Sequence, residues 1–158
     1  MTTRQSLRAD WIAIAVGTGA LALIMGALGY QYLGGMPPCH MCHWQRWPHI
    51  AAAIIGILGG GFLPRRFAFP IATAAILLVL TSGLIGAWQT GFQWGVLPGP
   101  TTCSGARFVL GSDMAPAPSC SLLQPVFLGQ TLAFWNAFFS LGIAGIGGWL
   151  LGRTADEP

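Results

Sequence analysis

Charged residues are scarce in this sequence. It has no lysine, and Asp, Glu, Lys and Arg together make up 7% of its 158 residues, against about 25% in a soluble globular domain. So little charge cannot keep a chain that is 54% hydrophobic dissolved in water, which excludes a soluble domain. The seven arginines are also too few and too scattered for a phosphate-binding stripe. We therefore predict an integral membrane protein with no nucleic-acid partner.

Four apolar segments approach the roughly 20 residues that a helix needs to cross the hydrocarbon core. They lead us to expect an all-α membrane protein, a four-transmembrane-helix bundle in which residues 1–158 form a single integral membrane domain. A cleaved signal peptide is the alternative for the first segment, but its apolar run exceeds the usual 7–15 residues or so. The predicted spans cover approximately residues 11–33, 43–63, 67–89 and 131–151.

The arginines predict the orientation. If both termini lie on one side, five arginines accompany them and two lie on the other side, so the positive-inside rule places the N and C termini in the cytoplasm. Loops 34–42 and 90–130 then face outward, which in a bacterium means the periplasm. The five are Arg4, Arg8, Arg65, Arg66 and Arg153, and the two are Arg46 and Arg107.

All four cysteines fall in the two outward loops. A buried structural cysteine would be found within the spans, whereas cysteines that share an oxidising face indicate disulfides. Of the three possible pairings, Cys39–Cys42 with Cys103–Cys120 is the natural one, although the sequence does not prove it.

The first pair forms a C-x-x-C motif just before the second span. Cys42 lies at or near the start of a helix, where free N–H groups favour a thiolate. Arg46 follows by four residues, so it shares the helical face of Cys42 and could stabilise a thiolate or donate to a carbonyl oxygen of a bound acceptor. The alternative for Arg46 is contact with lipid phosphates. Trp47 is expected in an aromatic belt at the membrane interface.

The second pair, Cys103 and Cys120, encloses 16 residues rich in Gly, Pro and small polar side chains. It is either a structural link worth on the order of 3 kcal/mol or an exposed disulfide that exchanges with the thiol of a partner.

Two other chemistries fit the stretch C-H-M-C-H on paper. It matches the haem c attachment motif, with His43 as axial ligand, but the membrane follows at once and haem leaves Cys103 and Cys120 without a role. Zinc needs four ligands in a closed site, and the cysteines and histidines of this stretch are too close together, although Cys103 and Cys120 could complete a set of four cysteines. We expect neither haem nor metal.

Three stretches, "PCHMCHWQRWPH", "GVLPGPTTCSG" and "APSCSLLQPVFLGQTLAFWNAFFSLG", together with the four spans, resemble the DsbB family of membrane disulfide oxidoreductases over nearly the whole chain. The resemblance implies an enzyme of the bacterial inner membrane that reoxidises a periplasmic, DsbA-like thiol oxidase and passes two electrons to quinone, either ubiquinone or menaquinone. Related possibilities are a vitamin K epoxide reductase-like enzyme, or a non-enzymatic scaffold with two structural disulfides.

The resemblance also implies roles for individual residues. Cys103 would form the mixed disulfide with the partner, Cys120 would be its disulfide mate, and Cys39 would exchange with these loop cysteines. Cys42 would face the quinone, assisted by Arg46, and Trp47 could also form a wall of the quinone site. Here Gln89 and Gln93 stand where many relatives carry a histidine and an acidic residue, and glutamine can form hydrogen bonds but cannot titrate. We expect His40 and His43 only to tune the thiols.

Overall fold

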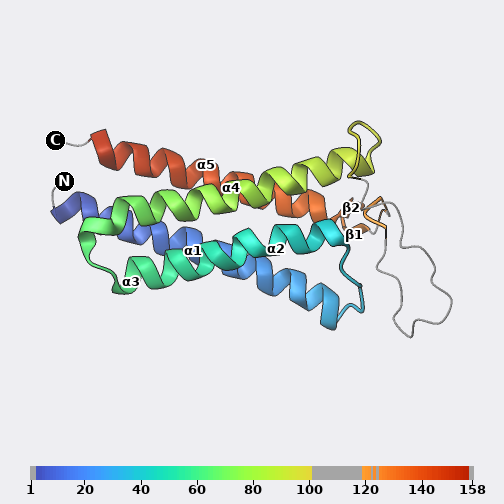
Figure 1. Cartoon of the computed structure of the whole chain (residues 1–158), viewed down its shortest axis with the longest axis horizontal. Helices are drawn as coiled ribbons and strands as arrows, with labels where there is room; N and C mark the ends of the chain where they lie inside the picture. The colour runs from blue at the N-terminus through green and yellow to red at the C-terminus, as the bar shows by residue number, and fades with distance from the viewer. Residues whose placement is uncertain (1–2, 101–118, 122, 124, 157–158) are drawn as a thin grey trace.

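The chain is described by a computed structural model for residues 3–100, 119–121, 123 and 125–156. Most of these residues are helical. The helices α1 (Thr3–Tyr32), α2 (His40–Ala53), α4 (Ala68–Gln93) and α5 (Leu132–Asp156) run lengthwise alongside one another (Figure 1). The start of α1 and the end of α5 lie at one end of the molecule, and the α1–α2 link lies at the other end (Figure 1).

Within the described residues, three helices are long and apolar enough to cross a membrane: Arg4–Tyr32, Arg65–Gln93 and Leu132–Ala155. The prediction of a mostly helical membrane protein is thus confirmed. The second predicted span falls on a divided segment, in which α2 continues into the π-helix η1 (Ile54–Gly59) and the short α3 (Gly60–Phe62). A 3-10 turn, η2 (Arg65–Phe67), then leads into α4.

The core is built from small side chains, and this explains how closely the helices approach. Fourteen buried residues form one cluster, and eight of the nine alanines among them are fully or almost fully inaccessible. Among the glycines of the described helices, Gly56 has the least room toward a neighbouring helix: a Cβ added there would lie 2.5 Å from the carbonyl oxygen of Ala13 and 2.9 Å from the Cα atom of Gly17, both in α1. Backbones can meet this closely only where side chains are absent.

A small hairpin precedes α5. Strands β1 (Pro125–Phe127) and β2 (Gln130–Thr131) are antiparallel, and the turn residues Leu128 and Gly129 have φ angles of 49° and 73°, the sign that tight hairpin turns favour. The indole Nε1 of Trp135 donates to the carbonyl oxygen of Phe127 at 3.1 Å. The hairpin is thereby fixed to the first turn of α5, at the same end of the molecule as the C-x-x-C motif (Figure 1).

Candidate redox site

Cys39 and Cys42 are joined by a disulfide at the start of α2. Cys39 is the N-cap residue of this helix, and its Sγ accepts a hydrogen bond from the backbone N–H of Cys42 at 3.2 Å. A sulfur atom thus takes the place that Ser or Asp fills at most helix starts. The cap makes the helix begin at His40, three residues before the predicted span, and it places the N-terminal N–H groups next to Cys39 as well as Cys42.

Cys120 lies beside this pair. It is 2% exposed and forms a small buried cluster with Cys39 and Met41. Gln93 holds its backbone in place, because the Gln93 side chain donates to the carbonyl oxygen of Cys120 at 3.3 Å and accepts from the Thr131 hydroxyl at 2.8 Å. Cys120 itself takes part in a disulfide. Cys103 lies outside the described residues, so the predicted Cys103–Cys120 pairing stays a prediction.

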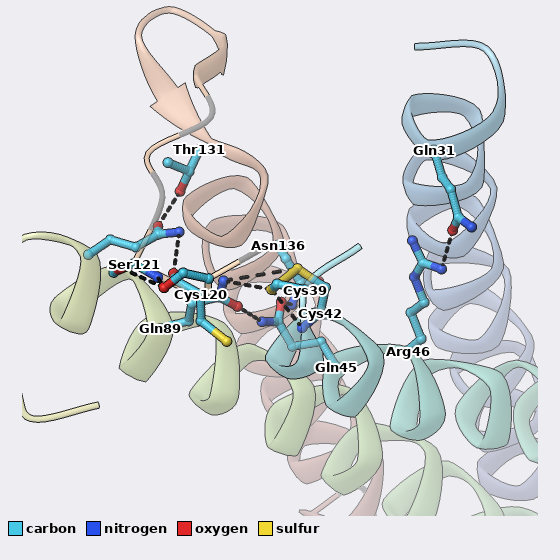
Figure 2. The surroundings of a disulfide bond; sticks show 12 residues. Gln31, Cys39, Cys42, Gln45, Arg46, Gln89, Cys120, Ser121, Thr131 and Asn136 are labelled. Carbon is cyan, nitrogen blue, oxygen red and sulfur yellow. Dashed lines mark hydrogen bonds between the residues drawn. A yellow bond between two sulfur atoms is a disulfide. The ribbon is translucent and has the colours of Figure 1, made fainter. Parts of the chain in front are cut away.

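A chain of side-chain amides leads from the disulfide into the bundle. Gln89 Nε2 donates to Cys39 Sγ at 3.3 Å and lies 4.0 Å from Cys42 Sγ. Gln45 Nε2 donates to Gln89 Oε1 at 2.6 Å, and Asn136 Nδ2 donates to Gln45 Oε1 at 2.8 Å. The chain joins α2, α4 and α5, and Figure 2 shows it beside the joined sulfur atoms. Gln89, which departs from the pattern of the family that the sequence resembles, thus contacts the sulfur atoms of the disulfide directly.

The chain continues to a buried histidine. Ser140 Oγ lies 3.1 Å from both Asn136 Oδ1 and His49 Nε2. The other ring nitrogen, His49 Nδ1, lies 2.9 Å from the backbone carbonyl oxygen of Gln45. His49 is 2% exposed, and both of its ring nitrogens have partners within the protein.

One face of α2 lines a mainly apolar cavity of about 290 Å³. Cys42, Gln45, Arg46 and His49 all contribute, because residues at i, i+3, i+4 and i+7 share one helical face. The opposite walls come from residues 22–30 of α1, from Val126 and Phe127 of the hairpin and from α5, including Asn136.

Arg46 projects from α2 toward α1. Its Nη1 donates to Gln31 Oε1 at 2.6 Å, and Figure 2 shows the side chain pointing away from the disulfide toward that partner. A guanidinium has several N–H donors, so a bond to Gln31 leaves others for a ligand in the cavity that Arg46 lines.

A second, smaller cavity of about 60 Å³ adjoins the first. Cys39, Gln89, Gln93 and Cys120 line it, and Cys42 and Arg46 line both cavities. The disulfide thus lies where a small cavity that reaches Cys120 meets a larger, mainly apolar cavity that runs between the helices.

Trp47 is not among the residues that line the larger cavity, and its place at a quinone site stays a prediction. Its side chain is 70% exposed, because successive helical residues are turned by about 100° and Trp47 therefore faces away from the side that carries Arg46. His40 and His43 are also exposed.

Sequence reasoning missed Gln45, His49, Asn136 and Ser140. For the first two a signal existed: their spacing from Cys42 and Arg46 puts all four on one face of the helix. Within the described parts of the chain, no three His, Cys, Asp or Glu side chains are grouped closely enough to hold a metal ion.

A bundle of apolar helices with a largely buried C-x-x-C disulfide at one end defines a helical membrane protein with a cysteine pair joined at the start of α2. Comparison with known proteins agrees: the family of the disulfide bond formation protein DsbB matches residues 9–150. The chain belongs to the DsbB family.

Individual relatives cover most of the chain. Disulfide bond formation protein B of Alkalilimnicola ehrlichii is 33% identical over 155 residues, covering 87% of this chain and 94% of the relative. The protein of the same name from Aromatoleum aromaticum is 32% identical over 137 residues, covering 77% and 82%. No solved structure gives a significant match.

Proposed function

We propose that this chain is a quinone-coupled thiol:disulfide oxidoreductase of the bacterial inner membrane. It reoxidises a periplasmic, DsbA-like thiol oxidase and passes two electrons to ubiquinone or menaquinone. In this proposal residues 1–158 form one membrane domain with four spans, the segment 40–62 being the second, and with both termini in the cytoplasm. The cysteine pairs then face the periplasm.

The observation that carries the proposal is the position of Cys42 on the walls of both cavities. An enzyme that exchanges disulfides with a soluble protein and delivers electrons to a lipid-soluble acceptor needs a dithiol open to both. The smaller cavity reaches Cys120, which supports exchange between the loop cysteines and Cys39. The larger cavity is apolar and lies between helices, which suits an acceptor that arrives from the membrane.

The residues of the larger cavity fit a quinone head group. Its volume of about 290 Å³ is near the lower end of ligand pockets, which starts at roughly 300 Å³. Arg46, His49 and Asn136 are among the polar groups on its mainly apolar walls, and Arg46 can donate to a carbonyl oxygen. When bound, quinone supplies the acceptor for two electrons and two protons.

The chain's own cysteines carry the exchange. The partner's thiolate attacks the Cys103–Cys120 disulfide at Cys103, which forms a mixed disulfide and releases Cys120. The second thiol of the partner then breaks the mixed disulfide, so the partner leaves oxidised and Cys103 and Cys120 are thiols. Exchange with Cys39–Cys42 restores the loop disulfide and leaves the C-x-x-C pair as a dithiol. Cys42 and Cys39 finally lose two electrons and two protons to the quinone and close their disulfide again.

The test uses the detergent-purified protein, a reduced DsbA-like protein as donor, and short-chain ubiquinone and menaquinone analogues as acceptors. We expect donor thiols and quinone to be consumed in a ratio of two thiols per quinone, and Cys42→Ala to abolish this turnover. His43→Ala, on the same helical turn but exposed, is the matched control and should retain activity. Unchanged turnover in Cys42→Ala would refute the mechanism, and an absence of coupled turnover in the wild type would favour a structural scaffold.

A further inference from the structure

The amide chain gives His49 a role that the cysteine exchange does not use. We propose that His49 is a redox-coupled proton store: it gains a proton when Cys39–Cys42 is reduced and releases it when the disulfide closes. Its use in quinone reduction rests on the proposed function, but the coupling itself concerns groups of this chain alone. His49 does not touch the sulfur atoms and acts on them only through the hydrogen-bonded side chains that lie between.

The direction of every hydrogen bond in the amide chain follows from the disulfide sulfur at one end of it. A disulfide sulfur can only accept, so Gln89 must present its NH₂ group to Cys39 and its oxygen to Gln45. Gln45 must then donate to Gln89 and accept from Asn136. Asn136 Nδ2 also donates to the backbone carbonyl of Ser82 at 3.3 Å, which fixes the same orientation independently. Asn136 Oδ1 therefore faces Ser140 as an acceptor.

The histidine end has two possible states. His49 Nδ1 lies against a carbonyl oxygen, so it carries a hydrogen in both the neutral and the charged ring. His49 Nε2 is then an acceptor when the ring is neutral and a donor when it is charged. Ser140 lies between this nitrogen and Asn136 Oδ1, and its hydroxyl has a single hydrogen to give.

A proton added to His49 completes the hydrogen bonds of the amide chain. In the proposed disulfide state the ring is neutral and one acceptor has no donor within the amide chain, and the proton taken up on reduction supplies that donor. With a neutral His49, the Ser140 hydrogen goes either to Nε2 or to Asn136 Oδ1, and the other atom loses its donor in this chain. With a charged His49, Nε2 donates to Ser140 and Ser140 donates to Asn136. All donors from His49 to Gln89 then point toward the sulfur atoms.

Reduction of the disulfide strengthens the sulfur end of the chain. A thiolate is a much stronger acceptor than a disulfide sulfur, because a hydrogen bond to a charged atom is roughly twice as strong as a neutral one. Gln89 reaches both sulfur atoms and can serve whichever carries the charge. Aligned hydrogen bonds polarise one another, so a thiolate at one end favours the imidazolium at the other.

The proton and electron counts balance. Two electrons and two protons from the partner's dithiol convert Cys39–Cys42 into one thiol, one thiolate and a protonated His49. When the disulfide closes again, the two electrons and the two protons leave to the quinone.

The other groups around His49 do not replace it. Cys42 and Arg46 of α2 and Tyr30 of α1 are the titratable groups that line the cavity with His49. The side chains that α4 and α5 present to it and to its chain are uncharged: Ser82, Gln89, Asn136 and Ser140. Arg46 keeps its charge throughout, so His49 is the group that can change charge with the redox state.

The experiment measures the protonation of His49 in quinone-free protein by nitrogen-15 NMR of labelled histidine, with His49→Asn used to assign the signal. At a fixed pH near neutrality, reduction should raise the ratio of protonated to neutral His49 at least about tenfold, equivalent to roughly one pH unit. Ser140→Ala removes the link and should abolish most of that change.

Thr90→Val is the matched control. Thr90 is a buried hydroxyl residue that donates to its own helix at Gly86 and lies outside the chain to His49, so its variant should keep the full change. An equal ratio in the oxidised and reduced wild type would overturn the proposal, and so would a full change in Ser140→Ala. Because no quinone is present, a failure here is distinct from a failure of the quinone-coupled turnover.

Discussion

Replacing Gly56 with alanine should force α1 and the π-helix η1 apart. The added Cβ would lie 2.5 Å from Ala13 O and 2.9 Å from Gly17 Cα. Both are backbone atoms, so relief requires one helix to move away from the other. Small residues packed around this contact, such as Ala52 and Ala53, would lose part of their packing.

The size of the effect is the difference between two terms. Overpacking a tight contact costs about 1–3 kcal/mol, and the 2.5 Å approach to a backbone oxygen indicates the upper part of that range, about 2–3 kcal/mol. Alanine regains up to about 1 kcal/mol because it favours a helix over glycine. We expect a net loss of about 1–2 kcal/mol, which for a chain of this size lowers Tm by about 2–8 °C.

Gly61 provides the matched control in the same helical segment, because an added Cβ there meets nothing within 4 Å. Gly61→Ala should leave Tm unchanged or raise it. Thermal unfolding followed by circular dichroism in one detergent compares the two variants with the wild type. The close-contact argument fails if Gly56→Ala is as stable as the wild type, or if Gly61→Ala is destabilised as much.

Two further predictions concern turnover. Arg46→Ala should raise the KM for quinone by about tenfold or more, since a hydrogen bond from a charged donor contributes about 1.5–3 kcal/mol. Steady-state kinetics at varied quinone would check this, and an unchanged KM would remove Arg46 from the quinone site. His43→Ala should keep kcat within about twofold, because an exposed side chain outside the network contributes little. A loss of tenfold or more in the same assay would assign His43 a direct role.

Hydropathy predicts where the helices lie but not where they begin. The expected spans 11–33, 67–89 and 131–151 fall on α1, α4 and α5, whose ends reach further: α1 starts at Thr3 and α4 runs to Gln93. These end turns carry polar residues, so an apolar window does not include them. The early start of α2 at His40 depends on a side-chain cap, which hydropathy does not register.

The cysteines could be found from the sequence, and the amide chain could not. C-x-x-C is a local pattern, and Arg46 follows by helical spacing. The contacts of Gln45, in contrast, join it to residues 44 and 91 positions away. Polar residues so far apart in the sequence can be identified as partners only when the packing of α2, α4 and α5 is known. Helical geometry could have predicted the exposure of Trp47, because the preceding residue, Arg46, shares the inward face with Cys42.

The sulfur of Cys39 has two roles that compete with each other: capping a helix and exchanging disulfides. In the disulfide form it caps the first turn of α2 by accepting a hydrogen bond from the Cys42 N–H. In the proposed exchange it must turn toward a loop cysteine. Each catalytic cycle would therefore loosen and re-form the beginning of a helix. A serine at this position keeps an oxygen for the helix while ending electron transfer, whereas an alanine removes both functions. The pair Cys39→Ser and Cys39→Ala thus separates the architectural contribution of this atom from its chemistry.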